Sequence, residues 1–447
     1  MPSHSFPSQE EHIKYLEKFN INQKRAMIII ILSILIDVFG YTLVLPLLPS
    51  IAKTFGASDI IVGILISSNA FSALIFAPIW GKLSDKYGRK SILIISQIGT
   101  GVSFLILGLS NSIYIILFAR VLDGVFGGQI PVIRAYITDI TTPQTRAQYM
   151  GKIMVGYTLG MILGPTIGGL LGVINWRFPP YLASSLSIVS IVTTIKLIVE
   201  TMPAERRADI KSRILLNQAN LNRKESIWNK EIGFRFTQIF LVSLASIIFT
   251  SSLALVLDKR YGANPFIIGS IMAVAGINVL IFGVFLMRRI IRKFGEKRLL
   301  FTSFIIFIIV FTFYPFLFEL WMVYIFIIPY SFCLVFMNPL IQTNITKAVG
   351  PDKQGEVSGW TTNLQAVSQS IAPLISTGFL EIGTLAISFI YLNSYQLIGF
   401  TNVLLATILL IIGYLDIKYH PKLYLHERLR RKRKAMRKKK NNDKKFE

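Results

Sequence analysis

Gly81-Lys-Leu-Ser-Asp85-Lys-Tyr-Gly88-Arg89-Lys90 is the stretch around which the rest of the chain is organised. Two apolar runs, 59–80 and 91–109, flank it, and each is close to the roughly 20 residues that a helix needs to cross a bilayer. The stretch is therefore predicted to be a charged turn outside the hydrocarbon, and its four cations favour the cytoplasmic side. Because Asp85 is the single acid among those cations, we expect it to be fixed by a specific partner.

The composition describes a membrane protein. The chain has 447 residues, of which 53% are hydrophobic, and its mean hydropathy is +0.57. One cysteine, Cys333, excludes an intrachain disulfide and a cysteine-ligated metal site. No metal or other cofactor is predicted, and neither an enzyme nor an ATP-driven pump is expected because the chain holds no P-loop string. The four histidines all lie in the tails, so none can form an intramembrane relay: His4, His12, His420 and His426.

The net charge of +24 is concentrated in segments predicted to be cytoplasmic. The densest run is the tail from Lys418 to Lys445. Basic residues next to a membrane span indicate topology and contact with anionic lipid headgroups, so nucleic acid is not a predicted partner. Both termini are expected on the cytoplasmic side of the cell membrane.

Twelve transmembrane helices are predicted, which makes this an all-α membrane protein. The spans are 26–49, 59–80, 91–109, 112–139, 149–174, 180–199, 236–257, 265–287, 299–318, 319–346, 355–381 and 389–415. They form two six-helix halves, with the following division: an N-terminal cytoplasmic segment 1–25, a first half 26–199, a linker 200–235, a second half 236–415 and a basic tail 416–447.

The two halves repeat in parallel. Phe55-Gly-Ala-Ser58 matches Tyr261-Gly-Ala-Asn264, and Gly63 and Gly88 match Gly269 and Gly295. Three further pairs are each separated by 208 residues (339−131, 359−151, 373−165): Pro131 with Pro339, Gly151 with Gly359, and Pro165 with Pro373. Two parallel halves of this kind place a substrate at their interface, near the middle of the membrane.

The pattern G-x-L-x-D-x-x-G-R-K between the second and third spans resembles the signature loop of the major facilitator superfamily. The resemblance implies the major facilitator fold. It also implies a conformational gate formed by Gly81, Asp85, Gly88, Arg89 and Lys90. The second copy, 288–297, keeps only Gly295 and the basic character, so its gate is expected to depend on charge alone.

An acidic residue, Asp37, lies within the first span. It is 11 residues past the predicted start of the span, which places it about 16 Å deep, near the midplane. The string Asp37-Val-Phe-Gly40-Tyr41 with Pro46 resembles the first-span signature of drug:proton antiporters. An intramembrane acid predicts proton or substrate binding. The alternative is an Asp that only pairs with another helix.

The fourth span has one charged stripe. Asp123, Gly127, Pro131 and Arg134 follow Arg120 at offsets of 3, 7, 11 and 14, which share one face of a helix. Arg120 and Asp123 are expected at a depth similar to that of Asp37. Arg120 matches the arginine that the family links to proton coupling. Alternatively, Arg120 and Asp123 only neutralise each other one turn apart.

Arg134 lies near the cytoplasmic end of the same span. It is a candidate for attracting an anionic substrate, with an interfacial anchor or gate partner as the alternative. The string Ala135-Tyr-Ile-Thr-Asp139-Ile-Thr141 that follows resembles the tetracycline-efflux subgroup.

The fifth span carries glycines at a spacing of four, which predicts close helix packing, and a proline that predicts a kink. The pattern resembles the antiporter motif of drug exporters, and the resemblance implies a hinge or seal. Its residues are Gly156, Gly160, Gly164, Pro165, Gly168 and Gly169.

Polar, uncharged residues in the second half are candidates for lining a substrate cavity. Together with Arg134 they are Asn338, Gln342, Gln365 and Gln369. The alternative for each of the four amides is a hydrogen bond that holds helices together.

These features predict a monomeric secondary transporter that exports a lipophilic or amphipathic organic compound in exchange for protons by alternating access. The alternative on the same fold is a proton-coupled symporter or facilitator for a polar or anionic metabolite. A third hypothesis is a receptor or scaffold, which would not need Asp37 or Arg120 within the membrane.

Overall fold

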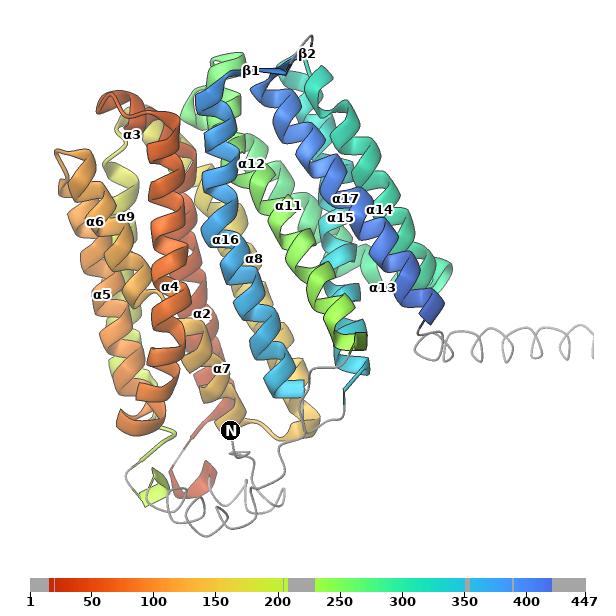
Figure 1. Ribbon diagram of the computed structural model, residues 1–447. Helices are drawn as coiled ribbons and strands as arrows, with labels where there is room; N and C mark the ends of the chain where they lie inside the picture. The colour runs from red at the N-terminus through yellow and green to blue at the C-terminus, as the bar shows by residue number, and fades with distance from the viewer. Residues whose placement is uncertain are drawn as a thin grey trace, which may run out of the picture.

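The computed structural model describes residues 16–19, 21–203, 205–207, 230–349, 354–387 and 390–419. Within these ranges eleven helices are long and apolar enough to cross a membrane. A further helix, α16 (Gln354–Ile382), has 29 residues and packs against α4 (Asp59–Tyr87) and α11 (Lys230–Tyr261) in the middle of the molecule (Figure 1). Its many Ser, Thr, Asn and Gln residues distinguish it from the eleven. The predicted all-α membrane fold is confirmed.

The helices form two bundles that lie side by side (Figure 1). The first, which we call the N-bundle, contains α4 together with α2 (Gln23–Val44), η1 (Leu45–Leu47), α3 (Leu48–Thr54), α5 (Arg89–Leu109), α6 (Ile113–Phe126), α7 (Gln129–Ile140), α8 (Pro143–Ile174) and α9 (Phe178–Leu197). The second, which we call the C-bundle, contains α11 and α16 together with α12 (Pro265–Leu280), the π-helical η3 (Ile281–Leu286), α13 (Met287–Phe294), α14 (Glu296–Phe313), η4 (Tyr314–Phe316), α15 (Leu320–Lys347) and α17 (Ser394–Tyr419).

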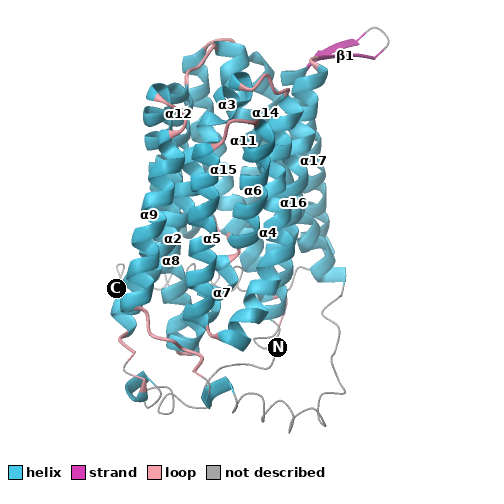
Figure 2. Cartoon of the chain, turned by 90° about the vertical axis from the view of Figure 1, so that its left-hand side faces the viewer, coloured by secondary structure: helices cyan, strands magenta, loops and turns pink. Residues whose placement is uncertain are grey.

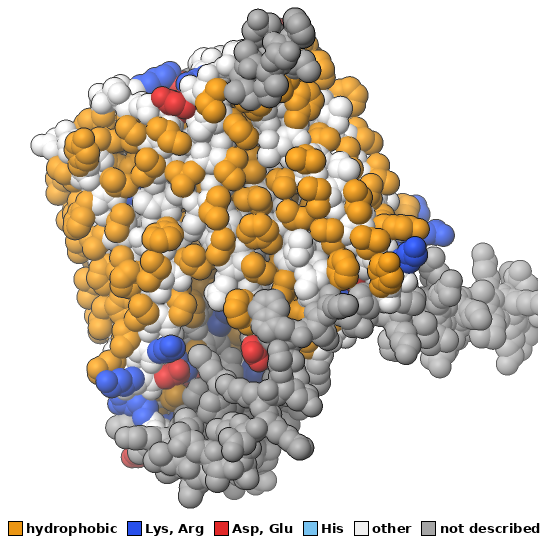
Figure 3. All heavy atoms as spheres, in the orientation of Figure 1, with side chains coloured by type: hydrophobic (Ala, Val, Ile, Leu, Met, Phe, Trp, Pro, Cys, Tyr) orange, Lys and Arg blue, Asp and Glu red, His pale blue; other side chains and the backbone are white. Residues whose placement is uncertain are grey.

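Each bundle has two ends. We call the end where α2 begins and α17 ends the terminal end, and the opposite end the distal end. The side of the molecule seen in Figure 3 is covered by hydrophobic side chains, whereas Lys, Arg, Asp and Glu gather towards the two ends. This distribution is the one expected of helices whose middles lie in lipid.

The internal repeat is visible in the backbone. Gly56 and Gly262 both have φ = +62°, and Gly88 and Gly295 have φ = +106° and +84°. Positive φ favours glycine, so the matched glycines stand where the chain turns in the same way in each bundle.

Two glycine contacts join the bundles in a symmetric manner. A Cβ atom on Gly269 of α12 would lie 2.3 Å from the carbonyl oxygen of Pro165 in α8. A Cβ on Gly63 of α4 would lie 3.0 Å from the carbonyl oxygen of Pro373 in α16. Gly63 repeats as Gly269 and Pro165 repeats as Pro373, so one contact is the other with the bundles exchanged. We call these two contacts the paired glycine contacts.

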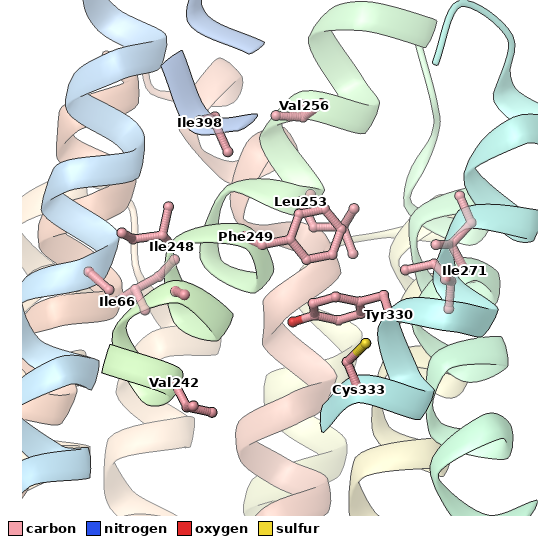
Figure 4. Close-up of a cluster of buried hydrophobic side chains, with 14 of the residues drawn as sticks. Ile66, Val242, Ile248, Phe249, Leu253, Val256, Ile271, Tyr330, Cys333 and Ile398 are labelled. Carbon is pink, nitrogen blue, oxygen red and sulfur yellow. The ribbon is translucent and has the colours of Figure 1, made fainter. Parts of the chain in front are cut away.

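Aromatic residues fill the core of the C-bundle. The Phe249 ring lies 4.6 Å from that of Tyr330 and 5.4 Å from that of Phe311. Figure 4 shows Phe249 and Tyr330 side by side with Cys333 below them. The Cys333 thiol is fully buried and donates to the Ser303 carbonyl oxygen at 3.4 Å, so this cysteine is a core residue.

The predicted start of the twelfth span at residue 389 is wrong. Two antiparallel strands, β1 (Thr384–Ile387) and β2 (Ile390–Asn393), precede α17 and project from the distal end (Figure 2). The Asn393 side chain accepts from the Gln396 backbone N–H, and the Gln396 side chain accepts from that of Asn393, both at 2.9 Å. This reciprocal capping box begins the helix at Ser394.

Arg235, the last residue of the predicted linker 200–235, does not belong to a linker. It lies within α11, is fully buried, and pairs with Asp416 of α17 at 3.2 Å. The apolar run of α11 therefore begins with a charge that another helix neutralises, because an unpaired buried charge would be too costly.

Candidate functional site

The predicted fourth span is two helices rather than one. α6 ends at Phe126, Gly127 and Gly128 follow, and α7 begins at Gln129. Pro131 has no backbone N–H and cannot bond to the Gly127 carbonyl, so the break falls where the helix ladder is weakest. The expectation of a single stripe from Arg120 to Arg134 is therefore wrong.

Neighbouring helices satisfy the carbonyl groups that the break releases. The Trp80 indole N–H of α4 donates to the Val125 carbonyl oxygen at 2.5 Å, and the Ser96 hydroxyl of α5 donates to that of Phe126. A broken helix inside a membrane protein is stable only where such partners exist, and here two side chains supply them.

Asp37 faces this break. Its Oδ1 accepts a hydrogen bond from Gln129 Nε2, in the first residue of α7, at 3.2 Å. The Asp37 side chain keeps part of its surface accessible, whereas Gln129 is 2% exposed. The acid predicted at the midplane thus lies between α2 and the start of α7.

Arg120 and Asp123 form a buried pair on α6. Arg120 Nη1 lies 3.0 Å from Asp123 Oδ2, and Asn69 Nδ2 donates to the same oxygen at 2.8 Å. The Arg120 guanidinium also lies 5.2 Å from the centre of the Tyr41 ring, and Tyr41 follows Asp37 by four residues on α2. The structure therefore groups the three predicted residues, although Asp37 bonds to Gln129 rather than to Arg120.

The segment Gly81 to Lys90 is not a turn of ten residues. α4 continues to Tyr87, Gly88 is the junction, and α5 begins at Arg89. Arg89 is 2% exposed and bonds to Asp85 at 2.5 Å, Asp139 at 3.3 Å and Ser84 Oγ at 2.5 Å. The expectation of a partner for Asp85 is confirmed. The ten-residue turn is wrong, although Lys82 and Lys86 are exposed as a charged junction requires, because Arg89 is buried and therefore paired.

Two more acids of the N-bundle belong to this network and were not assigned a role from the sequence. Asp139, 1% exposed, also pairs with Arg206 at 3.3 Å. Glu200 accepts from the backbone N–H groups of Arg89 and Lys90 at 2.8 and 3.0 Å. A carboxylate at the first turn of a helix complements its dipole. A lone acid at the end of an apolar run, as at Glu200, was the signal available in the sequence.

The glycine stripe of α8 lies directly against α2. A Cβ on Gly156 would meet the Ile31 carbonyl oxygen at 2.6 Å, and one on Gly164 would meet Thr42 Oγ1 at 1.9 Å. Gly160 and Gly168 make similar approaches to α2. Gly169 instead faces α12, where its Cβ would lie 2.4 Å from the Pro265 carbonyl oxygen. The predicted close packing is confirmed, and α8 runs through Pro165 without a break.

Charged residues from both bundles meet at the distal end. Lys53 pairs with Asp258 at 2.6 Å, and Lys259 pairs with Asp59. Glu381 of α16 accepts from the Asp59 backbone N–H at 2.9 Å. These five residues, which we call the distal charge cluster, border a pocket of about 330 Å³. Three links thus hold α3 and α4 to α11 and α16.

The remaining candidates lie on α7, α15 and α16. Arg134 is exposed and its Nη1 lies 3.3 Å from Thr362 Oγ1, across the two bundles. Gln365 and Gln369 follow Thr362 at helical spacing and share its face of α16. Gln342 bonds to Thr361 at 3.3 Å, within the C-bundle. Asn338 is partly buried on α15. The structure therefore brings Arg134 to the helix that carries the two glutamines.

Several predictions fall outside the described residues. They concern the four histidines, linker residues 208–229 and the basic tail from residue 420 onward. Among the residues that the structure does describe, no group of three or more His, Cys, Asp or Glu could hold a metal ion.

Curated proteins with similar sequences are named as drug-resistance proteins. The chain is 28% identical to the class H tetracycline resistance protein of Pasteurella multocida over 357 residues, 78% of this chain and 88% of that protein. It is 30% identical to multidrug resistance protein 2 of Bacillus subtilis (strain 168) over 285 residues, 63% of this chain and 71% of that protein.

Solved transporter structures share the fold. The human organic anion transporter MFSD10 superposes with a TM-score of 0.64 at 20% identity, covering 87% of this chain and 99% of that one. A bacterial homologue of the human lysosomal transporter Spinster, in an inward-facing and occupied conformation, gives 0.68 at 15% identity, covering 89% and 97%.

The sequence profile of the Major Facilitator Superfamily matches residues 30–373. That range includes α4 to α15, most of α2 and α16 up to Pro373, and the break in the fourth span; Glu381 and α17 lie beyond it. The chain belongs to the major facilitator superfamily and is an integral membrane transporter of the plasma membrane.

Proposed function

We propose that the protein exports a lipophilic or amphipathic organic compound in exchange for protons, with Asp37 as the proton carrier. The observation that carries this proposal is the position of Asp37: an acid within α2 that is hydrogen-bonded to a neutral amide, one turn before Tyr41, whose ring contacts Arg120 of the Arg120–Asp123 pair. An acid without a cation on its own carboxylate can gain and lose a proton at lower cost than one in an ion pair.

The relatives support the substrate class. The relatives reported above are tetracycline and multidrug resistance proteins by name, and the glycines of α8 follow the sequence pattern that resembles the antiporter motif of drug exporters. In this proposal Arg120 and Asp123 tune Asp37. The Arg89 network gates the terminal end, and the glycines of α8 let the bundles rock. Both termini are cytoplasmic, and the basic tail contacts anionic lipid headgroups.

The distal charge cluster is the gate at the opposite end. Its ion pairs must separate for the distal end to open, so removing two acids, Asp59→Asn with Asp258→Asn, is expected to favour the open state. A change of about 1 kcal/mol in that equilibrium is about fivefold. A cysteine placed at Ala52, which is 4% exposed beside the cluster, would report the opening.

This prediction is checked by labelling Ala52→Cys in a Cys333→Ser background with a membrane-impermeant maleimide applied from the distal side. The double variant Asp59→Asn/Asp258→Asn should raise the labelling rate about fivefold. The control is Glu319→Gln, an exposed distal acid within the C-bundle. Equal rates in all three backgrounds would show that the cluster does not hold the bundles closed.

Arg134 favours a second candidate, which is transport of a polar or anionic metabolite. Its exposed guanidinium faces α16 near Gln365 and could bind a carboxylate or phosphate in two-point fashion. An Arg134→Gln variant that lost transport of an organic anion, but kept export of lipophilic cations, would support this candidate.

The proposal predicts the effect of Asp37→Asn. Protein reconstituted in vesicles with a pH-sensitive dye is supplied with lipophilic cations, tetracycline-like compounds or organic anions. Wild type should move protons when a substrate is added, and Asp37→Asn should abolish that movement, because asparagine cannot carry a proton at physiological pH. The matched control is Glu205→Gln, which removes an exposed acid paired with Lys18 at the terminal end.

Substrate movement without protons, unchanged in Asp37→Asn, would contradict antiport. The protein would then be a facilitator, and Asp37 would have a structural role.

A further inference from the structure

A small cavity lies beside Asp37, between α2, α5, α7 and α9. Its volume is about 10 Å³, which is room for the centre of one water molecule. Its polar lining comes from residues that the sequence did not single out: Ser33, Gln97, Thr100, Gln129, Ser187 and Ser190. Six polar residues around so small a space are unusual in a membrane protein, where buried polar groups need partners.

Four polar atoms in this lining have no hydrogen-bond partner within the part of the chain that the structure describes. They are Gln97 Oε1, Thr100 Oγ1, Gln129 Oε1 and Ser190 Oγ. All four side chains are at most 3% exposed. A buried polar atom left without a partner destabilises the folded state, so four of them around one space call for a ligand.

In the structure both glutamine side chains donate through their amide nitrogens. Gln97 Nε2 donates to Ser33 Oγ at 2.8 Å and to Thr194 Oγ1 at 3.1 Å. Gln129 Nε2 donates to Asp37. Each amide nitrogen is therefore occupied, and each Oε1 is left as an acceptor without a donor.

The hydroxyl groups of Thr100 and Ser190 differ from those of nearby serines in their hydrogen bonding. Ser103 on α5 and Ser187 on α9 donate to the carbonyl oxygen four residues earlier, at 2.7 and 2.9 Å. Thr100 and Ser190 make no such bond within the described residues. Their hydroxyls remain able to donate elsewhere.

We propose that the cavity binds one water molecule that relays protons to and from Asp37. The Thr100 and Ser190 hydroxyls donate to the water, the two glutamine oxygens share one of its hydrogens, and the other hydrogen is donated to the Asp37 carboxylate. In the relay the water gives a proton to Asp37 and takes one from an incoming hydronium ion, so that it is left as neutral water. Because Asp37 also borders the cavity, the water is next to its carboxyl group.

The position of the water site bears on how proton movement is coupled to substrate movement. α5 and α9 lie on the side of the N-bundle away from the C-bundle (Figure 1), whereas a substrate would bind between the bundles. The water site would thus lie on the side of Asp37 away from the interface where a substrate binds. This consequence rests on the proposed role of Asp37, but the water site itself does not.

The test is infrared difference spectroscopy of the reconstituted full chain between acidic and basic pH, in ordinary water and in H₂¹⁸O. Wild type should show an O–H band that shifts in H₂¹⁸O, together with a carboxyl band that Asp37→Asn removes. Thr100→Val with Ser190→Ala should abolish the ¹⁸O-sensitive band and keep the carboxyl band. Ser103→Ala, one turn from Thr100 and outside the lining, should keep both bands.

Transport provides the second measurement. The Thr100→Val/Ser190→Ala variant should bind substrate with unchanged affinity but move protons about tenfold more slowly, which corresponds to about 1.4 kcal/mol in the barrier. If Asp37→Asn keeps its proton flux while the ¹⁸O-sensitive band follows Thr100 and Ser190, the proposed function fails and the water site stands. A wild-type spectrum without an ¹⁸O-sensitive band, a band that survives in the double variant, or a response to Na⁺ in place of pH would overturn the water site.

Discussion

Replacing Arg89 with alanine should destabilise the protein by about 3–5 kcal/mol, the usual cost of removing one partner from a buried ion pair. The guanidinium holds Asp85, Asp139 and Ser84 together, and its loss would remove one of the two cations, Arg89 and Arg206, that are paired with the buried Asp139. The measurement is the midpoint of thermal unfolding in detergent, followed by the loss of monodisperse protein on size-exclusion chromatography.

Two variants make this experiment specific. Arg292→Ala removes an exposed arginine of α13, at the position that repeats Asp85, and should change stability by less than about 0.5 kcal/mol. Arg89→Lys keeps the positive charge but loses the planar guanidinium, so its unfolding midpoint should lie between those of Arg89→Ala and Arg292→Ala. An Arg89→Ala midpoint equal to that of Arg292→Ala would show that the network adds no stability.

Placing a single methyl group on Gly168 should destabilise the protein by about 1–3 kcal/mol, as overpacking does in a filled core. The Cβ of alanine would lie 2.1 Å from the Leu43 carbonyl oxygen. Backbone cannot rotate aside as a side chain can, so α2 and α8 must separate. Unfolding in detergent and the rate of substrate transport should both report this change.

The same helix offers a matched control. Gly151 is exposed, and a Cβ there would have no neighbour within 4 Å, so Gly151→Ala should be neutral or stabilise the helix by up to about 1 kcal/mol. If both variants behave alike, the close approach of α2 and α8 is not required for stability.

Patterns within one segment predicted much of this structure. The spacing of glycines in the fifth span predicted a close approach, and the structure shows one. It could not show that α2 is the main neighbour, because that depends on the packing of the whole bundle. The repeated glycines before the second and eighth spans were markers of the repeat, and the structure gives them the same positive φ because that requirement is local.

Features that depend on contacts between segments were missed. Arg235 reads as a linker cation until Asp416, 181 residues later, is placed beside it. The break at Gly127 and Gly128 has a local cause in Pro131, but it persists because Trp80 and Ser96 supply donors from other helices. The start of α17 was different, because the Asn393–Gln396 capping pair could have been recognised in the sequence.

Rotation of one bundle about the paired glycine contacts would move the two ends of the transporter by unequal distances. Gly63 and Gly269 each lie four residues from the distal start of their helices, about 6 Å along the axis. The two contacts define an axis. When one bundle rotates about that axis both contacts are kept, and the atoms farthest from the axis move most. A tilt of about 10° would move helix ends ~25 Å away by ~4 Å, but the distal ends by only ~1 Å. Opening the distal end by rotation about this line alone therefore requires a larger angle than opening the terminal end does.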